Sequence, residues 1–442
     1  MDQRQFLARA AADGDVVTID TPVDPYLELA AVSAAFDGRI VRFSHVRGSD
    51  YEVVTGLAAD RRYFARALGC PPAELIHRLA DAMAHPQPLR QVTLAPCQEV
   101  VEPRVDLEQI PFLSHWASDA GPYATAAVLF TTDPEVGPNA SFHRVLRLNK
   151  TQAALRVVER RGTDNALRRT PTDLPAAICI GLPLHVLLAA AMAPPPGVDE
   201  LTIAQALAPT PVVRCLTQGT LVPADAELVL EGRLTHRLTA EGPFVDLTET
   251  LDLVRQQPVF EVDCITHRTR PLYHALLPGR LEHKLLMGMP REPTILAAVN
   301  EVARGLNVNI TPGGASWLHA VVQIEKRSAD DGRRAIDAAF RGHSSLKHVV
   351  IVDHDIDPFD PADVEWAIAT RFQADRGLVV LPDQPSSSLD PSATHTPGQK
   401  SRTAKLGLDA TVLWDTPNGP HDPQAYARVT FTPVDLTAYA QA

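Results

Sequence analysis

The sequence predicts a multidomain α/β chain, and three observations support that prediction. Short helical and extended runs alternate over residues 1–95, which is typical of an α/β domain. Residues 96–290 hold many short β-like runs separated by Pro and Gly turns, a pattern that favours a barrel or split barrel. An apolar helix over 291–306 leads into a second α/β segment, residues 307–442. With 442 residues and ~150 residues per domain, two or three domains are expected.

The N-terminal segment alternates apolar runs at helical spacing with short β-branched runs. Helices are expected at Phe6–Asp13, Tyr26–Ala35, Tyr63–Leu68 and Ala73–Ala84, and strands at Val16–Ile19 and Ile40–Phe43.

The central segment is richer in strands and has one clear helix, His185–Met192. The expected strands are Tyr123–Phe130, Phe142–Leu148, Ala176–Ile180, Pro211–Val213, Leu228–Leu230 and Val259–Ile265.

The C-terminal third begins with a candidate linker helix, Arg291–Gly305, whose apolar residues recur at helical spacing before a terminal glycine. The pattern then predicts strand, helix, strand, strand at Ala320–Ile324, Ala329–Arg341, His348–Val352 and Leu378–Leu381. Residues 382–405 are dense in Ser, Pro and Thr and are expected to form a loop or linker.

Composition excludes several classes of partner. The net charge of −12 and pI of about 5.7 argue against nucleic acid or an anionic membrane surface. No apolar run approaches the length of a membrane span, and the N-terminus lacks a signal h-region. The five cysteines form no CxxC pair, so reduced cysteines in a cytoplasmic protein are expected.

Two short stretches carry the chemistry. Glu241-Gly-Pro-Phe-Val-Asp246 places two carboxylates five residues apart, and Asn139-Ala-Ser-Phe-His-Arg144 places an amide and a guanidinium five apart. Arginine can hold a substrate carboxylate bidentately, while one of two nearby carboxylates acts as a general acid. From the residues alone, a solvated Gly-Pro turn and a surface arginine remain open alternatives.

Seven segments in order resemble the UbiD family of reversible decarboxylases, which use prenylated FMN. They are Asp119–Tyr123, Asn139–Arg144, Val222–Gly232, Glu241–Phe244, Asp353–Asp357, Glu365–Arg371 and Lys405–Thr411. The resemblance implies a central split barrel that holds the flavin. It also implies a C-terminal domain that makes a homodimer or larger homo-oligomer and a tail that returns to the flavin site.

The resemblance assigns roles to individual residues. Arg144 would position the substrate carboxylate, Glu241 would hold Arg144, and Asp246 would exchange a proton with the substrate carbon. Asn139 and Glu200 would hold a divalent metal, usually Mn²⁺, over the flavin phosphate, with K⁺ as a further candidate cation. The other implied cofactor contacts are Ser141, Met192 and Lys405. A flavin prenyltransferase would supply the cofactor.

The third metal ligand departs from the family. Counting from Asn139 without a gap, the family's histidine falls on Arg160. An arginine stays protonated and cannot ligate a metal, but it could contact the phosphate as a fixed cation. A local shift of alignment, with another ligand or water in that place, is the alternative.

His283 and Arg291 lie in a Glu-His…Pro-Arg pattern that resembles the shorter members, which act on furan-dicarboxylate and related heteroaromatic acids. The pair could bind a second carboxylate. The alternative is a helix start with a surface arginine. Asp353-His-Asp-Ile-Asp357 suggests a cation site but lacks EF-hand spacing, so a structural strand end is expected.

The sequence therefore predicts reversible, non-oxidative decarboxylation of an aromatic, heteroaromatic or α,β-unsaturated acid, furan-2,5-dicarboxylate being one candidate. The rival hypothesis is a flavin-binding homologue whose activity is lost or altered through Arg160.

Overall fold

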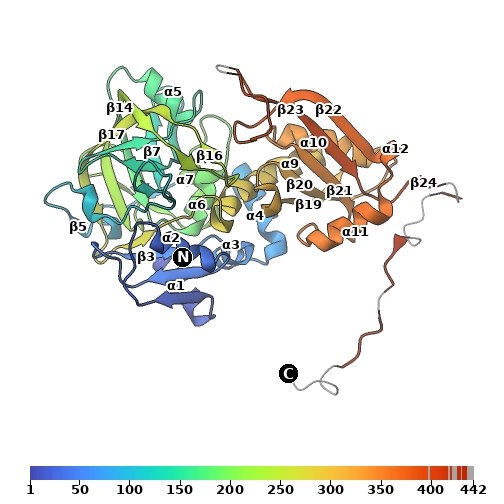
Figure 1. Cartoon of the computed structure of the whole chain (residues 1–442), viewed down its shortest axis with the longest axis horizontal. Coiled ribbons are helices and arrows are strands. Elements are labelled where there is room, and N and C mark those ends of the chain that lie inside the picture. The colour runs from blue at the N-terminus through green and yellow to red at the C-terminus, as the bar shows by residue number, and fades with distance from the viewer. Residues whose placement is uncertain (397–398, 417–418, 421–425, 430, 436–442) are drawn as a thin grey trace.

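The computed structural model describes residues 1–396, 399–416, 419–420, 426–429 and 431–435. Figure 1 shows a strand-rich body next to the N-terminal layer and a separate C-terminal sheet, with helices α4 and α9 between them.

The N-terminal region is a four-stranded sheet with helices, in the order β1-β2-β3-β18. Its elements are α1 (Gln3–Ala12), β1 (Val16–Ile19), α2 (Glu28–Ala35), β2 (Ile40–Phe43), β3 (Glu52–Thr55), α3 (Arg61–Leu68) and α4 (Leu75–Ala84). The fourth strand, β18 (Leu272–His274), comes from the end of the central segment and pairs in parallel with β3. Helix α2 begins two residues later than predicted, because Leu27 has a positive φ of 65°.

The central region is one nine-stranded sheet, in the order β6-β9-β10-β17-β14-β11-β7-β8 with β5 paired to β17. Its strands are β5 (Val100–Val101), β6 (Tyr123–Ala124), β7 (Val128–Asp133), β8 (Gly137–Phe142), β9 (Val145–Arg147), β10 (Gln152–Leu155), β11 (Leu174–Ile180), β14 (Leu228–Glu241) and β17 (Arg255–His267). The prediction of short strands at Leu228–Leu230 and Val259–Ile265 was wrong in length. Strands β14 and β17 pair along most of their length, so the ladder supports polar residues that lack a strand-like pattern.

Smaller elements surround this sheet. They are β4 (Arg90–Gln91), α5 (Gly162–Arg169), α6 (Leu184–Ala191), α7 (Glu200–Leu207), β12 (Pro211–Arg214), β13 (Leu221–Pro223), β15 (Phe244–Val245) and β16 (Leu251–Asp252). Helix α6 is buried over nearly its whole length in the apolar core and lies within one residue of its predicted bounds.

The linker is two short helices, α8 (Leu281–Gly288) and α9 (Glu292–Asn300), joined by a 3₁₀ turn at Met289–Arg291. The single predicted helix, Arg291–Gly305, is therefore too long. Asn300 Oδ1 accepts a hydrogen bond from Gly305 N at 2.9 Å, which turns the chain into the next strand.

The C-terminal region is a five-stranded sheet in the order β19-β20-β21-β23-β22. Its elements are β19 (Arg304–Ile310), β20 (His319–Glu325), α10 (Asp331–Gly342), β21 (His348–Asp353), α11 (Pro361–Arg371), α12 (Ala374–Gly377), β22 (Leu378–Pro385) and β23 (Arg402–Asp409); β24 (Asp415–Thr416) and β25 (Gly419–Pro420) follow. The predicted loop at 382–405 is shorter than expected, because β22 and β23 extend into both of its ends and pair with each other.

Asp353-His-Asp-Ile-Asp357 lies at the end of β21, which confirms its interpretation as a structural strand end. The fully buried Arg371 donates to Asp353 Oδ2 at 2.9 Å and to both oxygens of Asp355 at 2.8 and 2.6 Å.

Within the described part of the chain, no helix is both long and apolar enough to cross a lipid bilayer. All five cysteines are free thiols, as expected.

Candidate active site

Three carboxylates surround one guanidinium, that of Arg144. Arg144 lies in a two-residue break between β8 and β9, not on a continuous strand as predicted. Its Nε and Nη2 donate to Glu241 at 2.8 and 3.0 Å, and its Nη1 donates to Asp246 Oδ2 at 3.1 Å. The structure therefore brings together the three residues predicted to act on the substrate.

Glu241 is the most buried member of this group. It is the last residue of β14, its side chain is fully inaccessible, and Tyr123 Oη donates to its Oε1 at 3.1 Å. Burial, followed by the charge of Glu241, raises the pKa of Tyr123, so the phenol stays a donor. At the turn after Glu241, Gly242 has a φ of +93°, and a side chain there would lie against the carbonyl of Leu253.

A third carboxylate, Asp252, also binds Arg144. Asp252 Oδ2 accepts from Arg144 Nη2 at 2.9 Å, while Oδ1 accepts from Arg255 Nη1 at 2.5 Å and from Leu253 N at 2.9 Å. Burial opposes ionisation of Asp252, but the hydrogen bond from Arg255 and the charge of Arg144 lower its pKa.

Arg144 stays charged despite its burial. Desolvation lowers its pKa, but the hydrogen bonds and charges of Glu241, Asp246 and Asp252 outweigh this effect and raise it. The guanidinium carbon of Arg144 lies 4.7 Å from the ring centroid of Phe244. The ring thus makes a cation–π contact with the flat face of the guanidinium, whose edges bind the carboxylates.

The charge of Asp246 acts to raise the pKa of the nearby His283, and the charge of Arg144 acts to lower it. Its Nδ1 accepts from Gly279 N at 3.0 Å, and burial lowers its pKa, so its neutral form is favoured.

Of the predicted metal ligands, Asn139 lies on β8 and Glu200, the first residue of α7, contacts the next residue of that strand. Glu200 Oε2 accepts from Ala140 N at 2.9 Å, and burial raises the pKa of Glu200 to about 7. Asn139 Nδ2 donates to Ser141 Oγ at 3.1 Å. A buried carboxylate with no cationic partner in the described structure suits an added cation, and amide and carboxylate oxygens are hard-cation ligands.

His143 occupies the space beside Ser141. Its Nε2 lies 3.0 Å from both Ser141 Oγ and Thr163 Oγ1, and its Nδ1 lies 2.8 Å from the Arg156 carbonyl. Burial lowers the pKa of His143 to about 4. Among the described residues, no group of three His, Cys, Asp or Glu side chains is arranged to hold a metal, so other oxygens would have to complete such a site.

Arg291, His343 and Lys405 form a second group of basic side chains. Burial lowers the pKa of Arg291 to about 10, with a contribution from Arg161, and it lowers the pKa of His343 to about 3, with contributions from Arg291 and Lys405. Arg291 Nε and His343 Nε2 are buried without a partner in the described structure. Lys405 is buried, donates to the Ser344 carbonyl at 2.7 Å, and has its pKa lowered to about 8 by burial. The unpaired Arg291 Nε and the Lys405 ammonium would suit a phosphate or another anion.

Two predicted cofactor contacts, Arg160 and Met192, do not belong to the groups of polar side chains described above. Arg160 has an exposed side chain, and its backbone N–H donates to Asp164 Oδ2 at 2.8 Å. Gly162, not Arg160, faces Asn139: a side chain on Gly162 would meet Asn139 Oδ1. Met192 ends α6 in the apolar core.

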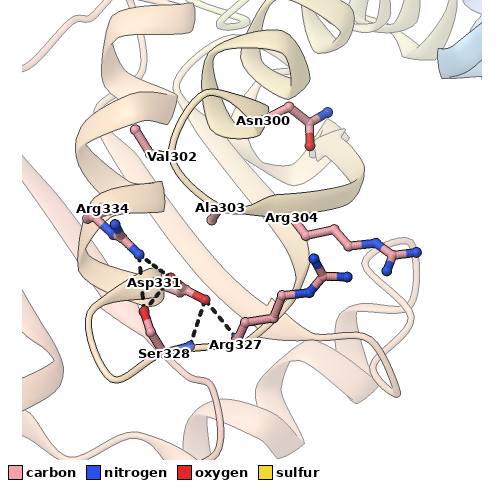
Figure 2. A pocket seen from close by; sticks show the side chains of 8 residues that line it. All are labelled: Asn300, Val302, Ala303, Arg304, Arg327, Ser328, Asp331 and Arg334. Carbon is pink, nitrogen blue, oxygen red and sulfur yellow. Dashed lines mark hydrogen bonds and ion pairs between the residues drawn. The ribbon is translucent and has the colours of Figure 1, made fainter.

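A cavity of about 480 Å³ lies elsewhere, at the start of α10. Figure 2 shows its three arginines, Arg304, Arg327 and Arg334. Each already forms an ion pair, with Glu325 or Asp331, at 2.5–3.0 Å. Because each of these arginines already has a carboxylate partner, we do not assign the catalytic site to this cavity.

The fold and the charged site define a carboxy-lyase built from three consecutive domains. Residues 7–83, 90–281 and 284–410 match the sequence models of the N-terminal, Rift-related and C-terminal domains of 3-octaprenyl-4-hydroxybenzoate carboxy-lyase. The chain belongs to the UbiD family and is a decarboxylase of that family.

Relatives and solved structures agree with this assignment. The chain is 40% identical to the anhydromevalonate phosphate decarboxylase of Methanosarcina mazei, over 93% of this chain and 96% of that one. The decarboxylase of the same name from Methanothermobacter thermautotrophicus is 39% identical over 92% and 96% of the two chains.

Among solved structures, the UbiD-class enzyme HmfF from Pelotomaculum thermopropionicum, in complex with FMN, has a TM-score of 0.93 at 36% identity and covers 99% of this chain and 100% of its own. The 3,4-dihydroxybenzoic acid decarboxylase of Enterobacter cloacae has a TM-score of 0.89 at 26% identity, over 99% and 98%. The predicted family, fold class and enzyme class are thereby confirmed.

Sequence reasoning missed four members of the site. Tyr123 and His143 lay inside segments that were singled out, and their polar side chains beside the key residues were a usable signal. Asp252 and His343 stand in no recognisable motif, and only folding brings them to Arg144 and Arg291.

Proposed function

We propose that this protein uses prenylated FMN to decarboxylate an α,β-unsaturated acid that carries a phosphate as a second anionic group. Arg291, whose buried Nε has no partner in the described structure, is the observation that supports the second anion in this proposal. The names of the relatives support phosphate in particular, because anhydromevalonate phosphate combines a dehydrated acid with a phosphate.

The carboxylate end of the substrate would bind Arg144. Glu241 holds the guanidinium from behind through Nε and Nη2, so only the Nη1–Nη2 edge can meet a substrate. Asp246 accepts from Nη1 and is partly exposed, so it is the group that would protonate the carbon after loss of carbon dioxide. His283, neutral and next to Asp246, would complete the polar wall.

The cofactor would be held across the domain junction. Lys405 would contact its phosphate and Ser141 would also contact the cofactor, while Asn139 and Glu200 would bind Mn²⁺ against it, with K⁺ as a further candidate cation. When bound, prenylated FMN supplies the electron sink that side chains cannot provide for a carbanion-like carbon. A flavin prenyltransferase would supply it, and Arg160 and Met192 are lesser candidates for contact.

The phosphate of the cofactor and the second anion of the substrate are chemically alike, and both could use the cations near Arg291. We assign Lys405 to the cofactor and Arg291 to the substrate. Arg291→Ala should then leave the bound flavin stoichiometry unchanged and raise KM, whereas Lys405→Ala should lower flavin occupancy. The reverse pattern would exchange the two assignments.

A homodimer or larger oligomer formed by the C-terminal sheet belongs to the same proposal. Leu378 and Val380 alternate as exposed apolar residues on its edge strand β22, and an evolved form of HmfF is dimeric.

The test uses protein coexpressed with a flavin prenyltransferase and measures carbon dioxide release from three acids. Anhydromevalonate phosphate should turn over with the highest kcat/KM, and the unphosphorylated acid should bind more weakly. Furan-2,5-dicarboxylate is the second candidate, because Arg291 and His283 could equally meet a carboxylate. Release from none of the acids by flavin-loaded protein would favour the rival hypothesis of a flavin-binding homologue without this activity.

A further inference from the structure

Arg144 has too few free donors to hold a substrate carboxylate as it stands. A guanidinium has five N–H bonds: one on Nε and two on each Nη. Glu241 takes the Nε hydrogen and one Nη2 hydrogen, Asp252 takes the second Nη2 hydrogen, and Asp246 takes one Nη1 hydrogen. One N–H remains, on Nη1.

A bidentate grip on a new carboxylate needs two neighbouring donors. The Nε–Nη2 edge is filled by the fully buried Glu241, which cannot leave without exposing an unpaired charge. The Nη1–Nη2 edge is the only other choice, and its Nη2 hydrogen is held by Asp252 at 2.9 Å.

The contacts of Asp252 allow its hydrogen bond with Arg144 Nη2 to break at little cost. Its two oxygens have different partners: Oδ2 binds only Arg144, whereas Oδ1 is held by Arg255 at 2.5 Å and by Leu253 N at 2.9 Å. After Oδ2 detaches, the carboxylate keeps a cation and a backbone donor. Asp252 lies in the two-residue strand β16, and the residues on either side of it, Leu251 and Leu253, are exposed. Little packing therefore opposes a small shift of the Asp252 side chain.

We propose that Asp252 competes with the substrate carboxylate for Arg144 and passes to Arg255 when substrate binds. The inference rests on the proposed function, because it takes Arg144 as the group that binds the substrate carboxylate. Asp252 is thus a positioning residue: in the free enzyme it occupies one Nη2 hydrogen of Arg144, and an incoming carboxylate must displace it to bind.

The test measures binding, not turnover. Full-length, flavin-loaded protein is titrated calorimetrically with butanoate, which has no double bond to react, and with the neutral butanamide. Asp252→Asn should tighten butanoate binding on the order of tenfold, because a charge-assisted competitor is removed. Binding of butanamide should not change.

Two further variants separate competition from a general change of charge. Glu249→Gln removes a carboxylate from the same β15–β16 connection, but Glu249 pairs with Lys284 and does not contact Arg144, so butanoate affinity should stay unchanged. Arg255→Met leaves Arg144 as the only cation paired with Asp252 and should weaken butanoate binding, which also serves as the test if Asp252→Asn does not fold.

Equal or weaker butanoate binding by folded Asp252→Asn, an equal gain in Glu249→Gln, or unchanged binding in Arg255→Met would overturn the proposal. Failure of the proposed function has a different signature: no carbon dioxide release from any acid by the parent protein, whatever the butanoate affinities.

Discussion

At the scale of single residues, Arg144, Glu241 and Asp246 form one electrostatic unit but differ in burial. Glu241 is fully inaccessible and Asp246 is 22% exposed. Arg144→Ala, Glu241→Gln and Asp246→Asn should each lower kcat by ~10²–10⁴-fold, since general-acid catalysis and carboxylate positioning both need the intact unit. Double variants should lose little more than single ones.

Stability should separate the three variants. Arg144→Ala leaves buried Glu241 without its cation and should cost ~3–5 kcal/mol of unfolding free energy, whereas Asp246→Asn should cost far less. Urea denaturation measures this, and circular dichroism confirms that each variant still folds. Near-normal turnover by Asp246→Asn would show that another group protonates the substrate carbon.

Glu200 predicts a pH-dependent cation site. Its pKa is raised to about 7 by burial, so protons compete with a metal below that pH. Manganese affinity should fall as pH drops from 8 to 6, and chelation or Glu200→Gln should remove the metal. Asp199→Asn is the control for metal content, because Asp199 caps α7 and acts on Glu200 only through its charge, which contributes to the raised pKa of Glu200. Manganese retained by Glu200→Gln would exclude Glu200 as a ligand.

The residue-level site was predictable where chemistry is written into local sequence. The acid pair across Gly242 and the Asn139–Arg144 stretch could be read because both stay close together along the chain. Asp252 could not, since its role depends on a β14–β17 connection whose shape the sequence does not reveal. Arg160 was singled out by counting alone, and folding instead places Gly162 beside Asn139.

At the scale of elements, a buried histidine makes the stability of the fold around helix α6 depend on pH. His185 on α6 lies 3.0 Å from Thr210 Oγ1, and burial lowers its pKa to about 3. Below pH ~6.5 His185 is protonated in the unfolded chain but stays neutral in the folded chain. The free energy of unfolding therefore decreases as pH falls from about 6.5 toward 3. His185→Gln, which can keep the hydrogen bond, should remove ~3 kcal/mol of the loss between pH 6.5 and 4.

Denaturant melts of the parent and His185→Gln at pH 7, 5.5 and 4 measure this difference. His77→Gln, at an exposed position on α4, controls for the substitution itself. Parallel pH profiles for parent and His185→Gln would show that other groups cause the acid loss.

Periodicity found the elements whose burial follows a simple pattern, such as α6 and α10. It misjudged β14 and β17, because long pairing partners stabilise polar residues in a ladder. It also extended the linker helix past Asn300, since the side-chain hydrogen bond that turns the chain there leaves no trace in apolar spacing.

At the scale of the whole molecule, one arginine joins three regions. Arg61, at the start of α3, donates to both oxygens of Glu292 on α9 at 2.8 and 2.6 Å, and its guanidinium lies 4.5 Å from the ring centre of Phe359 in the C-terminal region. Glu292 is fully buried and also accepts from Ile310 N at 3.0 Å. The ion pair therefore fixes the N-terminal layer against the linker and the first C-terminal strand.

Arg61→Ala should leave Glu292 charged and unpaired, which costs ~3–5 kcal/mol for a buried pair. Because the lost contact lies between regions and not within one, the calorimetric transition should broaden or split as the C-terminal sheet unfolds apart from the rest. Arg62→Ala is the matched control: Arg62 is the next residue, but its partner is Asp60 within the same turn. A single transition in Arg61→Ala, shifted no more than in Arg62→Ala, would show that the regions are held together elsewhere. Glu282 would be the next candidate, since its buried carboxylate on α8 accepts hydrogen bonds from Gly56 N and Ala58 N of the N-terminal layer.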